Sequence, residues 1–211
     1  MATLTYLHLA EEERFDELKQ ALDLGLFTEN INVTNKYYQT MLYFASRRNQ
    51  IELCKMLLDR GANPDIGDCD DFTPLHEAAG RGFKDLVEIL LQYGANINAR
   101  TSDKGTVLHM VAFNPTPGAL ETFHFLLEKG AYALINVRTM EGESALMKSI
   151  IRGNFQVFKC LLENRAEKYR KNGYNQTPLD LARMSGQYEM EDLILREIWY
   201  DNLFLLFLTC F

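Results

Sequence analysis

A short residue pattern recurs along the sequence at nearly constant spacing, and this repeat limits the fold more than any other feature. Paired leucines and a Gly-Ala step recur in phase, for example at Leu90-Leu91 and Gly94-Ala95. A threonine or serine recurs at intervals of 33, 33, 38 and 33 residues, at Thr40, Thr73, Thr106, Ser144 and Thr177. Such a chain folds as a row of similar units that bury their apolar faces against one another. Its function must then lie on a surface that the units share.

The one longer interval has a local explanation. FNPTPG (113–118) adds three residues between the two helices of its unit, and AYALINV (131–137) adds two after its glycine. Insertions in repeat proteins map to loops, which often carry function. The first insertion is therefore a candidate for function, with neutral drift as the alternative.

The best-formed unit explains the repeat in physical terms. Thr73 is placed to cap a helix, and Pro74 follows at the first helical position, where its missing N–H costs nothing. Residues 86–91 carry the wide apolar stripe of a second, more buried helix. Gly94 suits the left-handed position that ends this helix. The unit is thus predicted to be helix, turn, helix and exposed turn.

A period of 33 residues with T-P-L-H followed by alanine resembles the ankyrin-repeat family. The resemblance runs from Thr5 to Leu195, and the first unit resembles a degenerate opening cap. It implies an all-α fold: an ankyrin-repeat solenoid of stacked helix-turn-helix units joined by β-hairpin-like turns. We expect one domain over 1–195 and an apolar C-terminal extension over 196–211, the units lying at about 5–37, 38–70, 71–103, 104–141, 142–174 and 175–195.

Composition restricts the partners and the compartment. The chain carries a net charge of −7, of which residues 1–105 contribute −6. An acidic chain without a basic stripe argues against nucleic-acid binding. None of the four cysteines forms C-x-x-C, and the acidic N-terminus is no signal peptide. We expect a reduced, monomeric protein in the cytoplasm, with the nucleus as a second compartment.

Two histidines one period apart, His76 and His109, raise the question of a metal or general-base site. The sequence offers no third or fourth ligand near them, and the resemblance places this histidine in a local hydrogen-bond network with the threonine. We therefore expect no metal, no cofactor and no catalytic residue. Four carboxylates at Asp65, Asp68, Asp70 and Asp71 lack the order of a calcium loop, so a solvated turn is expected there.

The turns and first helices of such a solenoid form its concave face. Positions flanking the T-P-L-H anchor are predicted to point outward there, and their aromatic, methionine and arginine content is typical of interface hot spots. The candidates for contact with a partner are Tyr37, Gln39, Phe44, Arg47, Arg48, Asp70, Phe72, Glu77, Arg81, Asp103, Met110, Glu141, Lys148, Arg152 and Tyr174. The alternative is that Phe44 and Met110 pack between units and the arginines are merely solvated.

The C-terminal segment departs from the polar end expected of a capping unit. Its run from Ile198 to Phe211 is shorter than the about 20 apolar residues needed to cross a bilayer. We expect it to fold back over the last unit. Contact with a membrane surface through Leu203, Phe204 and Phe207, or with a partner, is the alternative.

The resemblance implies a non-enzymatic module that binds a protein partner through its concave face, as a scaffold, adaptor or inhibitor. Two narrower roles are a substrate receptor of a ubiquitin ligase and an inhibitor of a Rel-type transcription factor, whose stacks GANINARTSDKGTVLHMVA (94–112) resembles. The C-terminus lacks the leucine-proline-rich box of the first class and the acidic tail of the second. Short viral or parasitic mimics of such inhibitors would also look like this chain.

Overall fold

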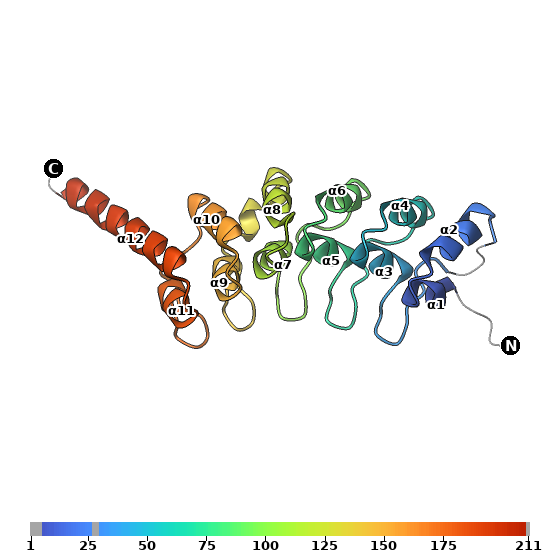
Figure 1. Cartoon of the computed structure of the whole chain (residues 1–211), viewed down its shortest axis with the longest axis horizontal. Helices are drawn as coiled ribbons and strands as arrows, with labels where there is room; N and C mark the ends of the chain where they lie inside the picture. The colour runs from blue at the N-terminus through green and yellow to red at the C-terminus, as the bar shows by residue number, and fades with distance from the viewer. Residues whose placement is uncertain (1–5, 27–29, 210–211) are drawn as a thin grey trace.

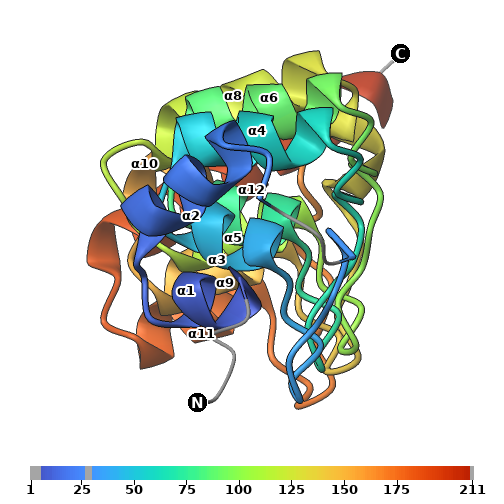
Figure 2. The same cartoon turned by 90° about the vertical axis from the view of Figure 1, so that its right-hand side faces the viewer.

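The chain forms a single row of paired helices, with the N-terminus at one end and the C-terminus at the other (Figure 1). The computed structural model describes residues 6–26 and 30–209, with side chains through Asp201. In the end view, the helices form two layers, and the turns between units project from the lower layer on one side (Figure 2). The predicted all-α repeat solenoid is confirmed.

The first helix of each unit belongs to an inner layer and the second to an outer layer. The inner helices are α1 (Tyr6–Glu11), α3 (Met41–Arg47), α5 (Pro74–Gly80), α7 (Val107–Phe113), α9 (Ala145–Ile151) and α11 (Pro178–Met184). The outer helices are α2 (Phe15–Asp23), α4 (Ile51–Asp59), α6 (Lys84–Gln92), α8 (Ala119–Glu128), α10 (Phe155–Glu163) and α12 (Tyr188–Thr209). A 3-10 turn, η1 (Ala131–Leu134), follows α8 at the site of the second predicted insertion.

The repeated threonine or serine begins the inner helices as predicted. Its side chain accepts a hydrogen bond from a backbone amide in the first helical turn, at 3.1 Å from Tyr43 in α3 and 3.4 Å from Met147 in α9. This bond satisfies one of the amides that have no partner within the helix. The phase of the repeat in the sequence thus sets where each unit starts.

The outer helices bury a broad apolar face, and residues with positive φ end them. Gly61, Gly94 and Gly130 adopt φ values of 85°, 85° and 102°, whereas Arg165 takes the equivalent position after α10 at 62°. One continuous apolar core extends from Leu7 to Ile194 along the row. No unit has a core of its own, so each depends on its neighbours.

Five turns between units close in the same way, and we call them fingers. In each, the first residue donates its backbone amide to the carbonyl of the last, at 2.9 to 3.1 Å. The fingers are residues 35–39, 68–72, 101–105, 139–143 and 172–176. Isolated antiparallel bridges at Thr34–Thr40 and Arg138–Ser144 flank two of them. These are the hairpin-like turns expected from the sequence.

The predicted insertion lies between α7 and α8, and it packs on the preceding unit. The backbones of Gly82 and Gly118 approach so closely that a Cβ on Gly118 would lie 2.1 Å from the Gly82 carbonyl oxygen. A Cβ on Gly82 would in turn lie 2.4 Å from Thr116 Oγ1. The longer loop therefore joins two units through glycines that no other residue could replace without a shift.

The expected fold-back of the C-terminal segment is wrong for its backbone. Helix α12 continues unbroken from Tyr188 to Thr209 and points away from α11 (Figure 1). The side chains of Leu203, Phe204 and Phe207 lie outside the described residues. No helix in the described part of the chain is long and apolar enough to span a bilayer.

Candidate partner-binding surface

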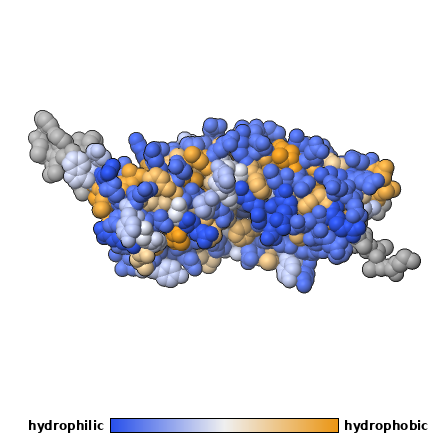
Figure 3. Space-filling view, viewed as in Figure 1, coloured by the Kyte–Doolittle hydropathy of each residue, from blue (hydrophilic) through white to orange (hydrophobic). Residues whose placement is uncertain are grey.

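The fingers and the inner helices meet at an angle, like the two arms of an L in the end view (Figure 2). We call the surface on the inside of this L the concave face. The face shown in Figure 3 is mainly hydrophilic, with separate apolar patches and no continuous one. Binding through such a surface depends on a few placed side chains more than on a broad apolar area.

Backbone hydrogen bonds connect the tip of each finger to the next. The amides of Cys69 and Ser102 donate to the carbonyls of Tyr37 and Asp70, each at 2.9 Å. The series continues from Met140 to Asp103 and from Gly173 to Glu141, each at 2.7 Å. The finger tips therefore form one ladder along the stack, which holds their side chains at regular positions.

The side chains on this ladder are aromatic, thioether and acidic, with Lys36 and Lys104 as exposed cations. Tyr37, Met140 and Tyr174 are 50%, 69% and 65% exposed. The carboxylates of the tips are also exposed, and none of them forms an ion pair with a described residue; they are Asp70, Asp71, Asp103 and Glu141. Lys104 is the exposed cation beside Asp103, so the described tips of units three to five carry a net negative charge.

Asp103 is the tip carboxylate that the finger holds most firmly. It accepts hydrogen bonds from the Thr101 hydroxyl and from the Gly105 amide, the latter at 3.0 Å. Partial burial opposes ionisation of this carboxyl, but the two hydrogen bonds, together with the charge of Lys148, outweigh burial and lower the pKa of Asp103. It is therefore ionised, and its position is fixed.

The predicted cations of the inner helices behave differently, because most have partners within the chain. Arg48 pairs with Glu13 at 2.5 Å, and Arg81 pairs with Glu77 at 3.1 Å. Arg152 lies 4.5 Å from the Phe113 ring centroid and donates to the Phe113 carbonyl at 3.1 Å. Among the described residues, Arg47 is exposed and has no ion pair.

Two other candidates are held by their own unit. Phe44 is half-buried, packs against the core and meets the Tyr43 ring edge-on. Gln39 accepts a hydrogen bond from Asn35 at 3.1 Å, across its own finger. These residues shape the concave face, but little of their surface is open to a partner.

A pocket of about 240 Å³ opens between units three and four. We call it the inter-unit pocket. One wall consists of Phe72, Glu77 and Arg81, and the other of Met110, Asn114 and Thr116. It brings together four predicted candidates with two residues of the inserted loop, Asn114 and Thr116, which were not among those candidates. The insertion thus contributes to the concave face.

His76 and His109 begin their helices as the resemblance implied. In His76, Nδ1 accepts from the Thr73 amide at 3.2 Å; in His109, Nδ1 accepts from the Thr106 amide at the same distance. Burial lowers the pKa of both imidazoles to about 4, so both are neutral near pH 7. With Nδ1 accepting, the remaining proton sits on Nε2.

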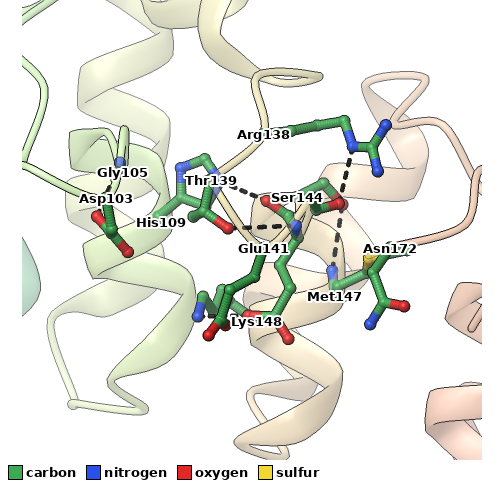
Figure 4. A network of polar contacts seen from close by, with 12 residues as sticks. Asp103, Gly105, His109, Arg138, Thr139, Glu141, Ser144, Met147, Lys148 and Asn172 are labelled. Atoms are coloured by element: carbon green, nitrogen blue, oxygen red, sulfur yellow. Dashed lines mark hydrogen bonds and ion pairs between the residues drawn. The ribbon is translucent and has the colours of Figure 1, made fainter. Parts of the chain in front are cut away.

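The two Nε2 groups differ. His109 Nε2 reaches the Glu143 carbonyl of the next unit at 3.1 Å, and Figure 4 shows this histidine beside the finger of unit five. His76 lines the inter-unit pocket, and its buried Nε2 has no hydrogen-bond partner among the described residues. The Ala99 backbone partly opposes the lowered pKa of His76, but it does not complete a hydrogen bond.

Polar contacts join unit five to unit four (Figure 4). Lys148 pairs with Glu143 at 2.5 Å, and both side chains are largely buried. Arg138 of unit four donates to two carbonyls of unit five, that of Gly142 at 2.8 Å and that of Lys171 at 2.6 Å. The side chains of Lys148 and Arg138 therefore stabilise contacts within the stack.

The described residues hold no cluster of histidine, cysteine or carboxylate side chains arranged for a metal ion. Asp68, from the acidic run, uses Oδ1 to accept the amides of Asp70 and Phe72 at 3.0 Å. Its Oδ2 contacts the Tyr43 hydroxyl at 3.1 Å. Asp68 therefore closes its finger, as the turn interpretation of this segment expected.

Tyr38, Asp71, Lys104 and Asn175 all adopt positive φ, between 59° and 67°, at the same place in their fingers. Gly142 occupies that place in unit five. Only Asp71 was singled out beforehand. The 33-residue spacing of these positions is the signal that could have identified the finger tips in the sequence.

The stacked units, the capped inner helices and the regular fingers together define a repeat protein that binds other macromolecules through a shared surface. A model of the family described as "Ankyrin repeats (3 copies)" matches three overlapping stretches, residues 7–101, 64–139 and 108–201. The chain therefore belongs to the ankyrin-repeat family. Ankyrin repeats are protein–protein interaction modules and are typically not catalytic.

Several known proteins are similar over most of the chain. Transient receptor potential cation channel subfamily A member 1 of Homo sapiens is 25% identical over 90% of this chain and 14% of its own length. Putative ankyrin repeat protein FPV222 of Fowlpox virus (strain NVSL) is 30% identical over 82% of the chain and 18% of its own length. Tyrosine-protein kinase HTK16 of Hydra vulgaris is 27% identical over 94% of this chain and 21% of its own length. The chain thus spans less than a quarter of the length of each of these relatives.

Proposed function

We propose that the chain binds a protein partner through its concave face, as a scaffold, adaptor or inhibitor in the cytoplasm, and catalyses no reaction itself. The observation that carries this proposal is the row of exposed Tyr37, Met140 and Tyr174 on a ladder of backbone hydrogen bonds. Large side chains fixed in advance lose little entropy on binding, which is what an interface hot spot requires.

The inter-unit pocket supports the same surface. It lies between the inner helices of units three and four, and Phe72 and Met110 contribute its apolar walls. A pocket near the middle of the stack gives a partner a desolvated contact, and the exposed tips on either side shield it.

Selection of binders from a displayed random-peptide library tests this proposal. Clones selected on the wild-type chain would be measured against Tyr37→Ala/Met140→Ala/Tyr174→Ala. The matched control replaces three exposed residues away from the fingers, Leu24→Ala/Tyr132→Ala/Tyr188→Ala. We expect affinity to fall about tenfold or more for the finger variant and to stay unchanged for the control. Clones that lose affinity only for the control would place the binding surface elsewhere.

A further inference from the structure

We propose that the concave face takes an extended basic segment of a partner that carries one bulky apolar side chain, held in the inter-unit pocket. This rests on the proposed function and names the chemistry of the partner. Two observations carry it: the charge of the finger tips around units three to five, and the size and walls of the pocket.

Around the pocket the finger tips carry a net negative charge, because four carboxylates outnumber the exposed Lys104, although arginines and lysines are frequent on the inner helices. Glu13, Glu77 and Glu143 neutralise Arg48, Arg81 and Lys148 within the chain. The tip carboxylates Asp70, Asp71, Asp103 and Glu141 have no such partners among the described residues. A basic segment supplies the missing cations, whereas an acidic segment or a nucleic-acid backbone is repelled.

The dimensions of the pocket favour one side chain over a small-molecule ligand. Its volume of about 240 Å³ lies below the roughly 300–1,000 Å³ of typical ligand pockets. Phe72 and Met110 offer apolar contact, while Arg81 and Asn114 stand at its polar edge. A large aliphatic or aromatic side chain would fill it and leave the polar edge to the backbone of the bound segment.

The finger ladder sets the direction of the segment. Asp70 and Asp71 lie at the finger of unit three, Asp103 at that of unit four and Glu141 at that of unit five. The pocket lies between units three and four. An extended segment along the tips would therefore place its apolar anchor in the pocket and its basic residues beside the anchor and toward unit five.

Three short synthetic peptides, labelled for fluorescence anisotropy, test the proposal with the full chain. One is rich in lysine and arginine around a single tryptophan, the second replaces that tryptophan with alanine, and the third replaces the basic residues with glutamate. We expect the first to bind best, with affinity that falls as salt rises from about 0.1 M to about 1 M, and the glutamate peptide not to bind.

Charge-reversed variants locate the electrostatic contact. Asp70→Lys/Asp103→Lys should weaken binding of the basic tryptophan peptide about tenfold or more. Glu52→Lys/Glu128→Lys changes the net charge equally on exposed positions of α4 and α8, and should leave affinity near that of the wild type. An equal loss of affinity in both variants would mean that only the overall charge of the chain matters, and it would overturn the proposal.

A pocket variant tests the anchor. Phe72→Ala should weaken the tryptophan peptide by about fivefold or more, and it should not change the weak binding of the alanine peptide. Tyr132→Ala, an exposed aromatic on η1, is the control. A Phe72→Ala variant that weakens both peptides equally contradicts an anchor in this pocket, and circular dichroism would show whether the variant is folded.

The two proposals can fail separately. If the displayed library yields acidic or uncharged binders that still require Tyr37, Met140 and Tyr174, the concave face remains the binding surface and the basic partner is wrong. If no binder depends on the fingers, the proposed function fails first. If the basic peptide binds but ignores both Asp70→Lys/Asp103→Lys and Phe72→Ala, the inference is overturned alone.

Discussion

At the scale of single residues, His76 and His109 show how one type of side chain both stabilises the start of a helix and makes stability depend on pH. Each accepts an amide hydrogen bond at the start of its helix and is almost fully buried. The charged imidazolium would lose both its solvation and that hydrogen bond. Folding therefore favours the neutral form.

We predict that the stability of the chain falls as the medium is acidified through the titration range of these histidines. Their pKa is about 4 in the folded chain and about 6.5 when unfolded. The unfolded state therefore binds more protons below about pH 6.5, and each histidine lowers the free energy of unfolding by about 2 kcal/mol between pH 7 and pH 5. Urea unfolding at both pH values measures this.

His76→Asn/His109→Asn provides the control for this prediction. Asparagine keeps an acceptor for the Thr73 and Thr106 amides but does not titrate. The variant should be less stable near pH 7, and its stability should depend less on pH over the same interval. An unchanged slope would mean that other groups cause the acid response.

Arg165 allows a second prediction at this scale. It ends α10 with φ of 62°, where units three and four have glycine. An L residue in the left-handed region costs roughly 1–2 kcal/mol, partly offset by the extra entropy that glycine has when unfolded. Arg165→Gly should therefore raise the free energy of unfolding by about 0.5 to 1 kcal/mol, as thermal or urea unfolding would show.

Gly94→Ala is the reverse substitution, from glycine to an L residue at the equivalent position of unit three. A Cβ at Gly94 would meet no atom within 4 Å, so only its φ of 85° opposes the substitution. This variant should lose about 1 kcal/mol. If both variants change stability in the same direction, backbone conformation is not the cause.

The sequence predicted these local features well because they depend on residues close together. The threonine cap and the histidine lie three residues apart, and Asp180 replaces the histidine in unit six with the same hydrogen bonds. The ion pairs were not predicted. Arg48 meets Glu13 from another unit, 35 residues away, and which carboxylate an exposed arginine reaches depends on packing between units.

At the scale of elements, α12 differs from the other outer helices in length and in its attachment. Lys168 contacts Glu197 at 3.3 Å and Asp201 at 2.9 Å, and the Tyr169 hydroxyl donates to Asp201 at 2.6 Å. These contacts lie where Ile198 also packs against the core. The segment after Arg196 is thus held by unit five.

We predict that Lys168→Ala loosens this part of α12 and leaves the rest of the stack intact. The Lys168 side chain is only 13% exposed, so its loss leaves two carboxylates without their cation. Hydrogen exchange of the amides from Glu197 to Asp201 should become faster, while the melting temperature changes by only a few degrees.

Arg196→Ala is the matched control, because Arg196 makes an exposed pair with Asp192 on the same helix at 2.7 Å. Such pairs contribute little. The control should exchange like the wild type over this segment. Faster exchange in both variants would show that the effect is not specific to the attachment to unit five.

The wrong expectation for α12 has an identifiable cause. The apolar run from Ile198 to Phe211 suggests a separate segment, but no glycine or proline follows Gly186, so nothing breaks the helix. The absence of helix-breaking residues is therefore a better predictor of this helix than the apolar run.

The inserted loop is a different case. Its glycine contacts and its place at the inter-unit pocket depend on the neighbouring unit, and the repeat spacing in the sequence does not reveal these contacts.

At the scale of the whole molecule, stability should vary along the row, because each unit contacts only its neighbours. Unit three has the full Thr73-Pro74 start and lies between two well-formed units. Unit five has Ser144 and Ala145 at its start and Arg165 at its end, and unit one has a neighbour on one side only.

We therefore predict that amides of α5 and α6 exchange most slowly under native conditions and that those of α1, α2, α9 and α10 exchange faster. Hydrogen exchange with mass spectrometry measures this directly. Arg165→Gly should slow exchange in α10 and leave α5 unchanged. The opening of unit three before its neighbours would contradict this order.

The ladder of backbone bonds between finger tips has a mechanical consequence. It runs along one margin of the stack, whereas the outer helices on the far side are joined through their side chains, by packing and by contacts such as that of Arg60 with the Leu22 carbonyl. A hydrogen bond tolerates little extension, and packed side chains can slide slightly. The row of finger tips should therefore keep a constant length and act as a hinge line. Thermal bending would change the spacing of the outer helices, and with it the curvature of the concave face, in one plane.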